Sequence, residues 1–437
     1  MGESRKNGCC IFFGHSHLSR LVNKITQLVT QVKQIIKSNT PGNGCTDLRA
    51  CLERAKRGDA DAQVQLGNRY REGNGVSMDL VEAVSWYRKA ADQGDAKAQC
   101  SIGFNYYTEG ESVEAVKWFR KAAEQGDALG QRSLAHMYAC GEGLAKDLFE
   151  SVKWYRKAAE QGNINSQYWL GYAYELGKGV SKHLAEALKW YRKAADQGDA
   201  KAQYRIGFNY YTEGELVESV KWYRKAAEQG NINSQYCLGY AYELGEGVSK
   251  DLAEALKWYR KAADQGDAEA QLNLGNWYHN GISVSKDPVE AAKWFHKAAD
   301  QGLDKAQHRL SILYNLGYGV PKNPVEAVKW ARKAAEQGHV QAQHNLGSLL
   351  YEDNGVTQNF TEAIKWFRSA AEQGDADSQN NLGVFYADGD VVPIDLDESK
   401  KWFRKAAAQG HENAKCALDE MSNPISLSAN FLQTLLN

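Results

Sequence analysis

The chain has 437 residues, of which 11% are aromatic and only 6 are proline, so its composition excludes a largely disordered protein. Its formal net charge is −1, but basic residues predominate in residues 1–40 and acidic residues in the remainder. The repetitive body therefore lacks the basic stripe that nucleic-acid binding normally needs, and we expect no nucleic-acid partner.

The N-terminal part, residues 1–44, carries a basic amphipathic pattern. Residues 15–37 contain no acidic side chain, and their basic residues lie opposite a seven-residue apolar pattern. The apolar positions are Leu18, Leu21, Val22, Ile25, Leu28, Val29, Val32, Ile35 and Ile36. Three alternatives fit a helix of this kind: a coiled coil that forms a homodimer, a peripheral membrane contact, or docking onto the first repeat. A breaker-rich linker, residues 38–44, follows and favours the first two.

Targeting signals near the N-terminus are weak. Ile11-Phe12-Phe13 is too short for the apolar core of a signal peptide, and the sequence has no apolar run of 18 residues. Gly2 and the pair Cys9-Cys10 resemble a lipid-anchor pattern, but Lys6 stands where serine or threonine is expected. We therefore expect a cytoplasmic or membrane-peripheral protein, and leave signal-independent export open.

A tryptophan recurs through the rest of the chain at spacings of 32 or 36 residues. The positions are Trp86, Trp118, Trp154, Trp190, Trp222, Trp258, Trp294, Trp330, Trp366 and Trp402, and nine of the ten are followed by tyrosine or phenylalanine. A period of this length is typical of a solenoid, in which each unit buries its apolar face against its neighbours. We expect the tryptophan and its aromatic neighbour to be core residues, with each indole N–H bound to a buried acceptor.

One half of each unit is a helix, here termed helix B, that contains the tryptophan. In the first unit Asp79 is its N-cap and Glu82 completes a capping box. Pro288 and Pro324 occupy the first helical position in two later units, where a missing N–H is harmless. Gly94 then ends the first of these helices as a C′ glycine.

The other half is helix A, which Asp95 caps in the second unit. A Leu-Gly pair in its middle, such as Leu66-Gly67, predicts close approach of two helix backbones, because a mid-helix glycine otherwise costs about 1 kcal/mol. A glycine-rich loop such as Gly73-Asn74-Gly75-Val76 leads back to helix B. We expect this loop to be shorter in the two units whose tryptophan spacing is 32 residues.

These patterns predict an all-α fold: about ten helix-turn-helix repeats at residues 60–410, within a solenoid that spans residues 45–421. Residues 48–58 resemble a lone helix B and residues 411–421 a lone helix A, as expected for caps that cover the apolar ends. Residues 422–437 are predicted to form a C-terminal capping helix. Residues 163–200 recur as 231–268 with three differences, Trp169/Cys237, Lys178/Glu246 and His183/Asp251, so part of the array is a copy.

The sequence shows no catalytic, metal or cofactor signature. The eight cysteines do not follow the repeat, which indicates free thiols rather than a disulfide framework. The histidines lack metal-ligand spacing, and residues 171–178 miss the phosphate-loop pattern by one residue. We therefore expect no enzyme, no metal and no cofactor.

The phrases Asp-Ala-x-Ala-Gln-x-x-Leu-Gly-x-x-Tyr and Gly-x-Gly-Val-x-x-Asp-x-x-Glu-Ala-x-x-Trp-Tyr-Arg-Lys-Ala-Ala resemble the Sel-one-like repeat, a relative of the tetratricopeptide repeat. The resemblance implies a right-handed α/α superhelix of helix pairs whose A helices line the concave wall. It also implies an adaptor or scaffold that binds a protein or peptide partner.

Aromatic residues and an arginine gather at variable helix A positions in the middle repeats, and these residue types are enriched in binding hot spots. The candidate partner-binding residues are Tyr168, Trp169, Tyr172, Tyr204, Arg205, Phe208, Tyr236 and Tyr240. Plain packing between neighbouring units is the competing interpretation for each residue. The expected function is a non-enzymatic protein–protein interaction scaffold. The alternative is a carbohydrate or cell-wall binding or processing protein, which aromatic platforms also serve.

Overall fold

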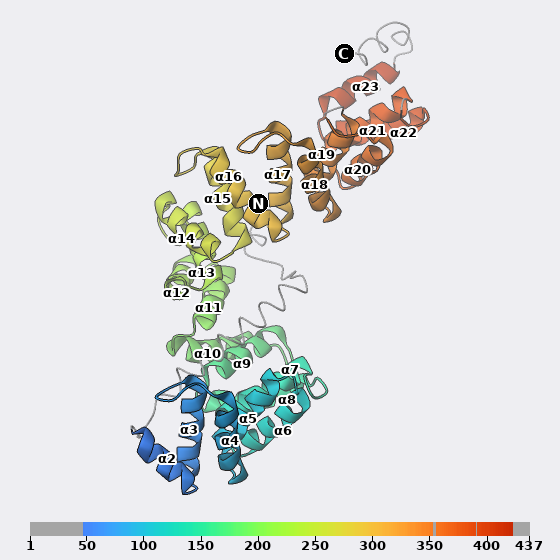
Figure 1. Cartoon of the computed structure of the whole chain (residues 1–437). Helices are drawn as coiled ribbons and strands as arrows, with labels where there is room; N and C mark the ends of the chain where they lie inside the picture. The colour runs from blue at the N-terminus through green and yellow to red at the C-terminus, as the bar shows by residue number, and fades with distance from the viewer. Residues whose placement is uncertain (1–46, 353–354, 390, 423–437) are drawn as a thin grey trace. The chain divides into compact units, whose positions relative to one another are not determined.

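A computed structural model describes residues 47–352, 355–389 and 391–422 of the chain. Within these ranges every regular element is a helix, and the helices follow one another as tandem pairs (Figure 1). The predicted all-α solenoid is therefore confirmed. The proposed helices at residues 15–37 and 423–437 lie outside the described ranges.

The chain divides into two compact units, Met1–Gly214 (unit 1) and Glu215–Asn437 (unit 2). Unit 1 contains α2 (Leu48–Lys56), α3 (Ala60–Glu72), α4 (Leu80–Asp92), α5 (Ala96–Thr108), α6 (Ser112–Glu124), α7 (Ala128–Cys140), α8 (Leu148–Glu160), α9 (Ile164–Leu176), α10 (Leu184–Asp196) and α11 (Ala200–Glu213). Its last residue, Gly214, lies in the second of the two shortened A–B loops.

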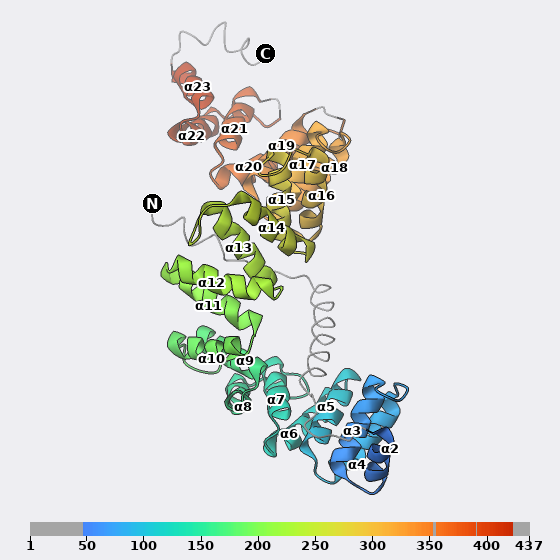
Figure 2. The same cartoon turned by 90° about the vertical axis from the view of Figure 1, so that its left-hand side faces the viewer.

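Unit 2 contains α12 (Leu216–Glu228), α13 (Ile232–Leu244), α14 (Leu252–Asp264), α15 (Ala268–Asn280), α16 (Pro288–Asp300), α17 (Asp304–Leu316), α18 (Pro324–Glu336), α19 (Val340–Tyr351), α20 (Phe360–Glu372), α21 (Ala376–Asp388), α22 (Leu396–Ala408) and α23 (Glu412–Ser422). In both units the odd-numbered helices are A helices and the even-numbered helices are B helices. Within each unit consecutive helices pack side by side, as Figures 1 and 2 show for α3 with α4 and for α21 with α22.

Local capping fixes the helix starts as predicted. The Asp79 carboxylate accepts a hydrogen bond from the Glu82 N–H at 3.0 Å, and Asp95 accepts one from the Ala98 N–H at 2.8 Å. Pro288 and Pro324 stand at the beginnings of α16 and α18. Each cap satisfies an N–H group that the helix itself leaves free, so the sequence determines these boundaries locally.

The mid-helix glycines make room for an aromatic ring in addition to the neighbouring backbone that was expected. A Cβ on Gly67 would lie 2.7 Å from the Tyr87 ring and 3.1 Å from the Ala83 carbonyl oxygen, so an aromatic ring lies on the glycine in addition to a nearby backbone. The repeat with Ser311 at the glycine position has Ala331 in place of the aromatic residue. Glycine and aromatic ring are thus two parts of one packing arrangement, and the small Ala331 side chain leaves room for Ser311.

The A–B loop needs glycine where it crosses the preceding repeat. Gly179 has a φ of +75°, and a Cβ there would overlap the carbonyl oxygen of Leu148, the first residue of α8. Ser283 occupies the corresponding loop position in another repeat, with a φ of 56°. It is the one non-glycine residue with positive φ among those described. The loop therefore packs closely against the previous helix B.

A ladder of buried glutamines connects the repeats. Gln167 on α9 donates to the Ala159 carbonyl of α8 at 3.1 Å and accepts from Gln197, which follows α10, at 2.8 Å. The hydrogen-bonded glutamine pairs are Gln63–Gln93, Gln99–Gln125, Gln131–Gln161, Gln167–Gln197, Gln235–Gln265, Gln271–Gln301, Gln307–Gln337, Gln343–Gln373 and Gln379–Gln409. Each buried amide is satisfied by two flanking helices, and this fixes the register of the stack.

The tryptophans were predicted to find buried acceptors. Among the described residues, Trp258 and Trp366 have an acceptor, and in both cases it is a partly exposed glutamate. Trp258 donates to Glu254 at 3.2 Å and Trp366 donates to Glu362 at 3.1 Å. The buried indole nitrogens of Trp86, Trp154, Trp190, Trp294, Trp330 and Trp402 have no hydrogen-bond partner in the described part of the chain. In five of these six repeats the corresponding glutamate binds the lysine just before the tryptophan instead, as Glu150 binds Lys153.

Lysine ammonium groups contact the faces of the indole rings and partly compensate for the missing hydrogen bonds. A lysine three residues after the tryptophan places its ammonium over the indole ring in nine repeats, for example Lys89 over Trp86 at 3.7 Å from the ring centroid. Such cation–π contacts are worth about 0.5–1 kcal/mol each at exposed sites. The tryptophans are thus held by packing and cations rather than by hydrogen bonds.

Candidate partner-binding site

Three aromatic side chains predicted to bind a partner form one cluster on α9 of unit 1. The ring centroids of Tyr168 and Trp169 are 5.3 Å apart, and those of Trp169 and Tyr172 are 5.5 Å apart, both edge to face. Trp169 keeps 38% of its surface exposed, whereas its two neighbours are half-buried. Edge-to-face packing holds these rings rigidly, and a rigid exposed indole is a favourable anchor for a partner.

Arg205 on α11 joins this cluster from the next repeat. Its guanidinium carbon lies 5.2 Å from the Tyr172 ring centroid, and its Nη1 lies 3.3 Å from Glu175 Oε1. Burial alone would lower the pKa of Arg205, but the Glu175 carboxylate prevails and raises it. The pKa of Tyr168 is raised by burial, and the Arg205 charge opposes that rise. The arginine is therefore a fixed cation beside the aromatic rings.

Glu175 is shared between two partners. Its second oxygen accepts a hydrogen bond from the Tyr191 hydroxyl of α10 at 2.5 Å. Burial, followed by the negative charge of Glu175, raises the pKa of Tyr191, so this hydroxyl stays protonated and donates. The Glu175 carboxylate thus ties α9, α10 and α11 together under the cluster.

A recess of about 210 Å³ opens beside this carboxylate. Its apolar walls are Leu176, Leu184, Leu188 and Phe208, and its polar lining comprises Glu175, Lys182, Tyr191, Arg205, Asn209 and Thr212. All of these residues belong to unit 1. The recess was not predicted from the sequence. Among its lining residues, only Arg205 and Phe208 had been predicted to bind a partner.

The remaining candidates occupy different positions. Tyr204 and Phe208 on α11 pair with ring centroids 6.3 Å apart, and both are half-buried. Tyr236 belongs to unit 2, where it packs against Tyr259 at 5.7 Å and is only 7% exposed. Tyr240, also in unit 2, is half-buried. The structure therefore brings together Tyr168, Trp169, Tyr172 and Arg205, while Tyr236 offers a partner little surface.

The copied repeat gives an internal comparison. Trp169 corresponds to Cys237, which is buried, and the cationic Lys178 corresponds to Glu246. Lys178 places its ammonium 5.3 Å from the Tyr172 ring centroid. Two of the three differences between otherwise identical segments thus change the aromatic and cationic character of this surface.

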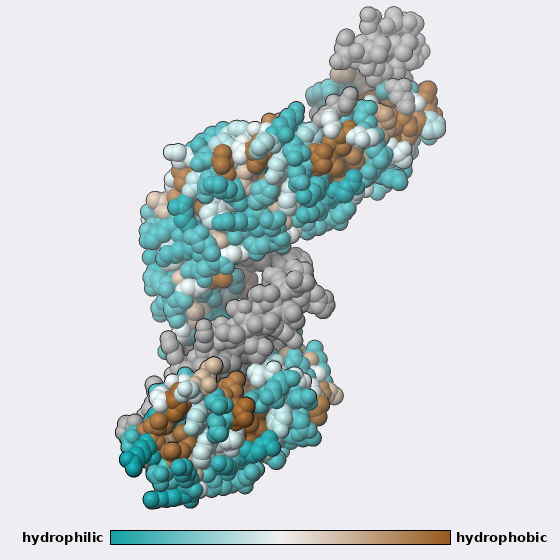
Figure 3. Space-filling model, in the orientation of Figure 1, coloured by the Kyte–Doolittle hydropathy of each residue, from teal (hydrophilic) through white to brown (hydrophobic). Residues whose placement is uncertain are grey.

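Exposed apolar residues elsewhere recur with the repeat. Val81, Val113, Phe149, Val217, Val289 and Val325 all stand at the second position of a B helix and are between 53% and 81% exposed. Figure 3 shows apolar surface near α3 and α4 in unit 1 and around α19–α22 in unit 2. Because the same helix position is exposed in these repeats, the six residues belong to the repeat and do not single out one site.

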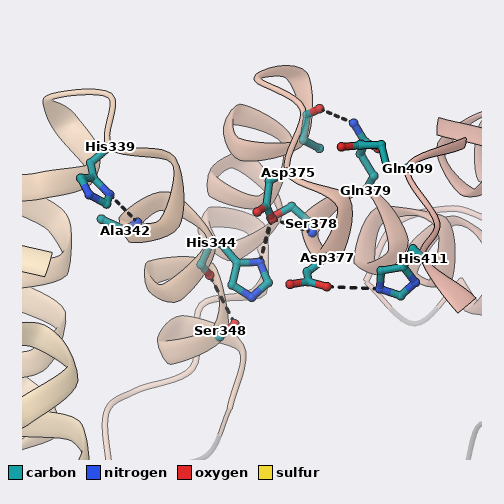
Figure 4. Close-up of polar contacts among 11 residues, drawn as sticks. His339, Ala342, His344, Ser348, Asp375, Asp377, Ser378, Gln379, Gln409 and His411 are labelled. Carbon is teal, nitrogen blue, oxygen red and sulfur yellow. Dashed lines mark hydrogen bonds and ion pairs between the residues drawn. The ribbon is translucent and has the colours of Figure 1, made fainter. Parts of the chain in front are cut away.

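A second polar cluster lies in the C-terminal repeats (Figure 4). His344 on α19 contacts Asp375, the N-cap of α21, at 3.3 Å, and His411 contacts Asp377 at 3.2 Å. Burial opposes ionisation of Asp375, but hydrogen bonds from His344 and Ser378 prevail and lower its pKa to about 2. The described residues contain no group of three or more such side chains that could hold a metal ion. These contacts therefore join successive A helices, α19 to the start of α21 and α21 to the start of α23.

The sequence of the repeat array matches the Sel1 repeat family. The matches are consecutive, at residues 60–95, 96–127, 128–163, 164–199, 200–231, 232–267, 268–303, 304–339, 340–375 and 376–411. The chain belongs to the Sel1 repeat family. The Sel1 repeats begin with helix A and end after helix B, and their span agrees with the array predicted at residues 60–410. Sel1 repeat proteins generally mediate protein–protein interactions.

A solved structure with an SLR fold shares this architecture. The crystal structure of c5321, a protective antigen of uropathogenic Escherichia coli strains with an SLR fold, is similar at 38% identity and a TM-score of 0.74. That match covers 86% of this chain and 82% of c5321. A Sel1 repeat protein from Oxalobacter formigenes is 27% identical over 90% of this chain and 93% of its own, with a TM-score of 0.40.

One curated relative shares a short stretch. The secretory immunoglobulin A-binding protein EsiB of Escherichia coli O6:H1 is 40% identical over 50 residues, which make up 11% of this chain and 10% of EsiB. The chain thus matches only a tenth of that relative's length. Among the residues described, no helix of this Sel1 repeat protein combines the length and hydrophobicity needed to cross a membrane.

Proposed function

We propose that this Sel1 repeat protein is a non-enzymatic scaffold that binds a polypeptide partner through the aromatic cluster of α9 and Arg205 of α11. The observation that carries the proposal is the exposed Trp169 indole, held edge to face by Tyr168 and Tyr172. Tryptophan, tyrosine and arginine are the residue types that contribute most binding free energy at protein interfaces.

The relatives support a protein partner. EsiB is named for binding secretory immunoglobulin A, and c5321 is described as a protective antigen. Secretory immunoglobulin A is therefore a reasonable first probe for this chain, alongside an unbiased capture from a mixed protein extract.

Trp169→Cys is the most informative variant, because the copied segment carries a cysteine, Cys237, at the corresponding position of a folded A helix. Phe149→Ala is the matched control, since Phe149 is 68% exposed but lies on helix B. We expect Trp169→Cys to weaken capture of a partner at least tenfold, as loss of about 1.4 kcal/mol or more implies. Phe149→Ala is expected to leave capture unchanged.

Equal losses in both variants, or none in Trp169→Cys, would contradict the proposal. The same proteins are applied to a glycan array and to cell-wall fragments, because an exposed indole beside Tyr172 also suits stacking on a sugar ring. Binding there that depends on Trp169, without any protein partner, would instead favour a carbohydrate-binding function.

A further inference from the structure

The recess beside Glu175 differs from the equivalent place in unit 2 at a position on the following A helix. Tyr191 of α10 and Tyr259 of α14 belong to the duplicated segment, and each donates a hydrogen bond at 2.5 Å to the equivalent glutamate. Just after the copied segment, Trp277 of α15 packs edge to face on Tyr259 at 5.6 Å and is 2% exposed. The corresponding residue of α11 is Asn209. A small amide therefore lines the recess at the position where unit 2 has an indole.

The size and walls of the recess suit an apolar side chain. An apolar cavity of ~150 Å³ is enough to hold a benzene molecule, and the recess measures about 210 Å³. Its walls include Leu176 and Leu184, which remain 45% and 40% exposed, and the half-buried ring of Phe208. A leucine, isoleucine, methionine or phenylalanine side chain would bury this surface.

The charges around the recess differ between the two copies. Lys182 and Arg205 line the recess with one carboxylate, Glu175, to which Arg205 is already bound. Lys178 places its ammonium 5.3 Å from the centroid of the Tyr172 ring, which Arg205 also contacts. The corresponding residues of unit 2 are Glu246, Lys250, Asn273 and Glu243, so there two carboxylates stand with one lysine. Two of the three cations, Lys178 and Arg205, therefore have no counterpart in unit 2.

We propose that the recess between α9, α10 and α11 receives an apolar anchor residue of the partner polypeptide, with an acidic residue next to the anchor paired with Lys178 or Lys182. The inference rests on the proposed function, because it specifies the chemistry of the same protein partner. The anchor supplies apolar burial, and the neighbouring carboxylate supplies orientation and a faster encounter with the site.

The test is a randomised peptide array probed with the full-length chain. We expect enrichment of peptides in which an aspartate or glutamate lies within two residues of leucine, isoleucine, methionine or phenylalanine. In the best peptide, replacement of the anchor by alanine should raise the Kd at least tenfold, since burial of such a side chain contributes that much or more.

Variants of the protein test the apolar and the charged contributions to binding separately. Asn209→Trp introduces the indole found at the equivalent position of unit 2, Trp277, and should weaken binding of the best peptide at least tenfold. Lys178→Glu, also the residue of the copy, should weaken binding roughly threefold to tenfold and reduce its dependence on salt. Glu246→Lys in unit 2 is the matched control and should leave binding unchanged.

If circular dichroism shows that Asn209→Trp does not fold, Leu184→Glu provides a second test. Leu184 is exposed, and its replacement places a carboxylate at the opening of the recess. Unchanged binding in the folded blocking variant, or enrichment of peptides without an apolar–acidic pair, overturns the inference. So does a failure to enrich any peptide. If Trp169→Cys still abolishes protein capture in these cases, the proposed function stands; if it does not, both fall.

Discussion

The contact between glycine and an aromatic ring makes an unusual prediction at the residue scale. Alanine in place of a mid-helix glycine normally stabilises a helix by about 1 kcal/mol. A Cβ on Gly275, however, would lie 2.5 Å from the buried Phe295 ring. We expect Gly275→Ala to destabilise the protein by about 1–3 kcal/mol, as overpacking does, measured by urea denaturation.

The control removes the ring. In a Phe295→Ala background, which is itself destabilised by roughly 3–5 kcal/mol, the added methyl group has space. There Gly275→Ala should become neutral or stabilising, as the natural pair Ser311 and Ala331 suggests. Additive effects of the two substitutions would show that the ring is not what excludes the side chain.

His308 predicts a pH dependence of stability. Its ring stacks on His339 with centroids 4.7 Å apart, and burial, followed by the charges of His339 and Arg309, lowers its pKa to about 4. Between pH 6.5 and 4 the unfolded chain therefore binds a proton that the folded chain does not. Stability falls as the pH falls through this window and levels off below it.

His308→Leu, with the residue found at the equivalent Leu272, should flatten this dependence. We expect the parent to lose about 2 kcal/mol of unfolding free energy between pH 7 and 4.5 through this group, and the variant to lose less. His339 remains and its pKa is also lowered by burial, so part of the slope persists. Urea midpoints at both pH values measure the effect, and equal slopes in parent and variant would rule out His308 as the source.

Residue-scale predictions from the sequence were reliable where the physics is local. Asp79 and Asp95 cap their helices as expected, because an N-cap bond joins residues only three apart. The acceptors of the indole groups were mostly not predicted, because the glutamate of each repeat can bind the lysine alone, as Glu150 does, or both donors, as Glu254 binds Lys257 and Trp258. The sequence contains both donors, and only the packed side chains show which of them are bound.

At the scale of elements, the glutamine ladder is expected to stabilise the stack. Gln167 is 4% exposed and bonds to both flanking helices. Gln167→Ala leaves the Ala159 carbonyl and the Gln197 amide without this partner, and should destabilise the protein by about 1–3 kcal/mol. The midpoint of urea denaturation measures the loss.

Gln65→Ala is the control, because Gln65 is less buried and its side chain bonds to the exposed carboxylate of Asp61 at 2.7 Å. A change within about 0.5 kcal/mol is expected there. A Gln167→Ala/Gln197→Ala double variant should be less destabilised than the sum of the two single changes. Strict additivity would mean that the ladder does not couple neighbouring helices.

The sequence predicted helices better than their connections. The starts of α4 and α5 follow from Asp79 and Asp95, and the glycine after each helix marks its end. The ladder was not predicted, because Gln167 finds its carbonyl acceptor in the preceding repeat, through tertiary packing. The recess was missed for a similar reason: its lining combines side chains of three helices, among them Glu175, Tyr191 and Asn209.

At the scale of the whole molecule, the period alone established a stacked array, since no repeat can bury its apolar face by itself. The division into two compact units at Gly214 was not foreseen. Both shortened loops, after Tyr106 and after Tyr210, look equivalent in sequence, yet only the second coincides with the division. The two loops cannot be told apart from the sequence, because the sequence does not show how tightly the helices on either side of each loop pack.

The basic segment at residues 15–37 makes the last prediction, at the same scale. In a helix, Arg20, Lys24, Lys33 and Lys37 would stand opposite an apolar face, and the segment contains no acidic residue to pair with them in a coiled coil. Each lysine or arginine near an anionic membrane surface contributes about 1 kcal/mol of attraction. We therefore expect the full chain to float with vesicles that contain phosphatidylserine, and residues 45–437 to remain behind.

Added salt should release the full chain, because the attraction is screened over about 8 Å at physiological ionic strength. Replacing the four basic residues by glutamine is the matched control, since it keeps the apolar face and removes the charge. Flotation that survives both salt and this replacement would indicate insertion by apolar burial alone. A full chain that does not float but elutes at twice the mass of residues 45–437 would instead assign the segment to a homodimer.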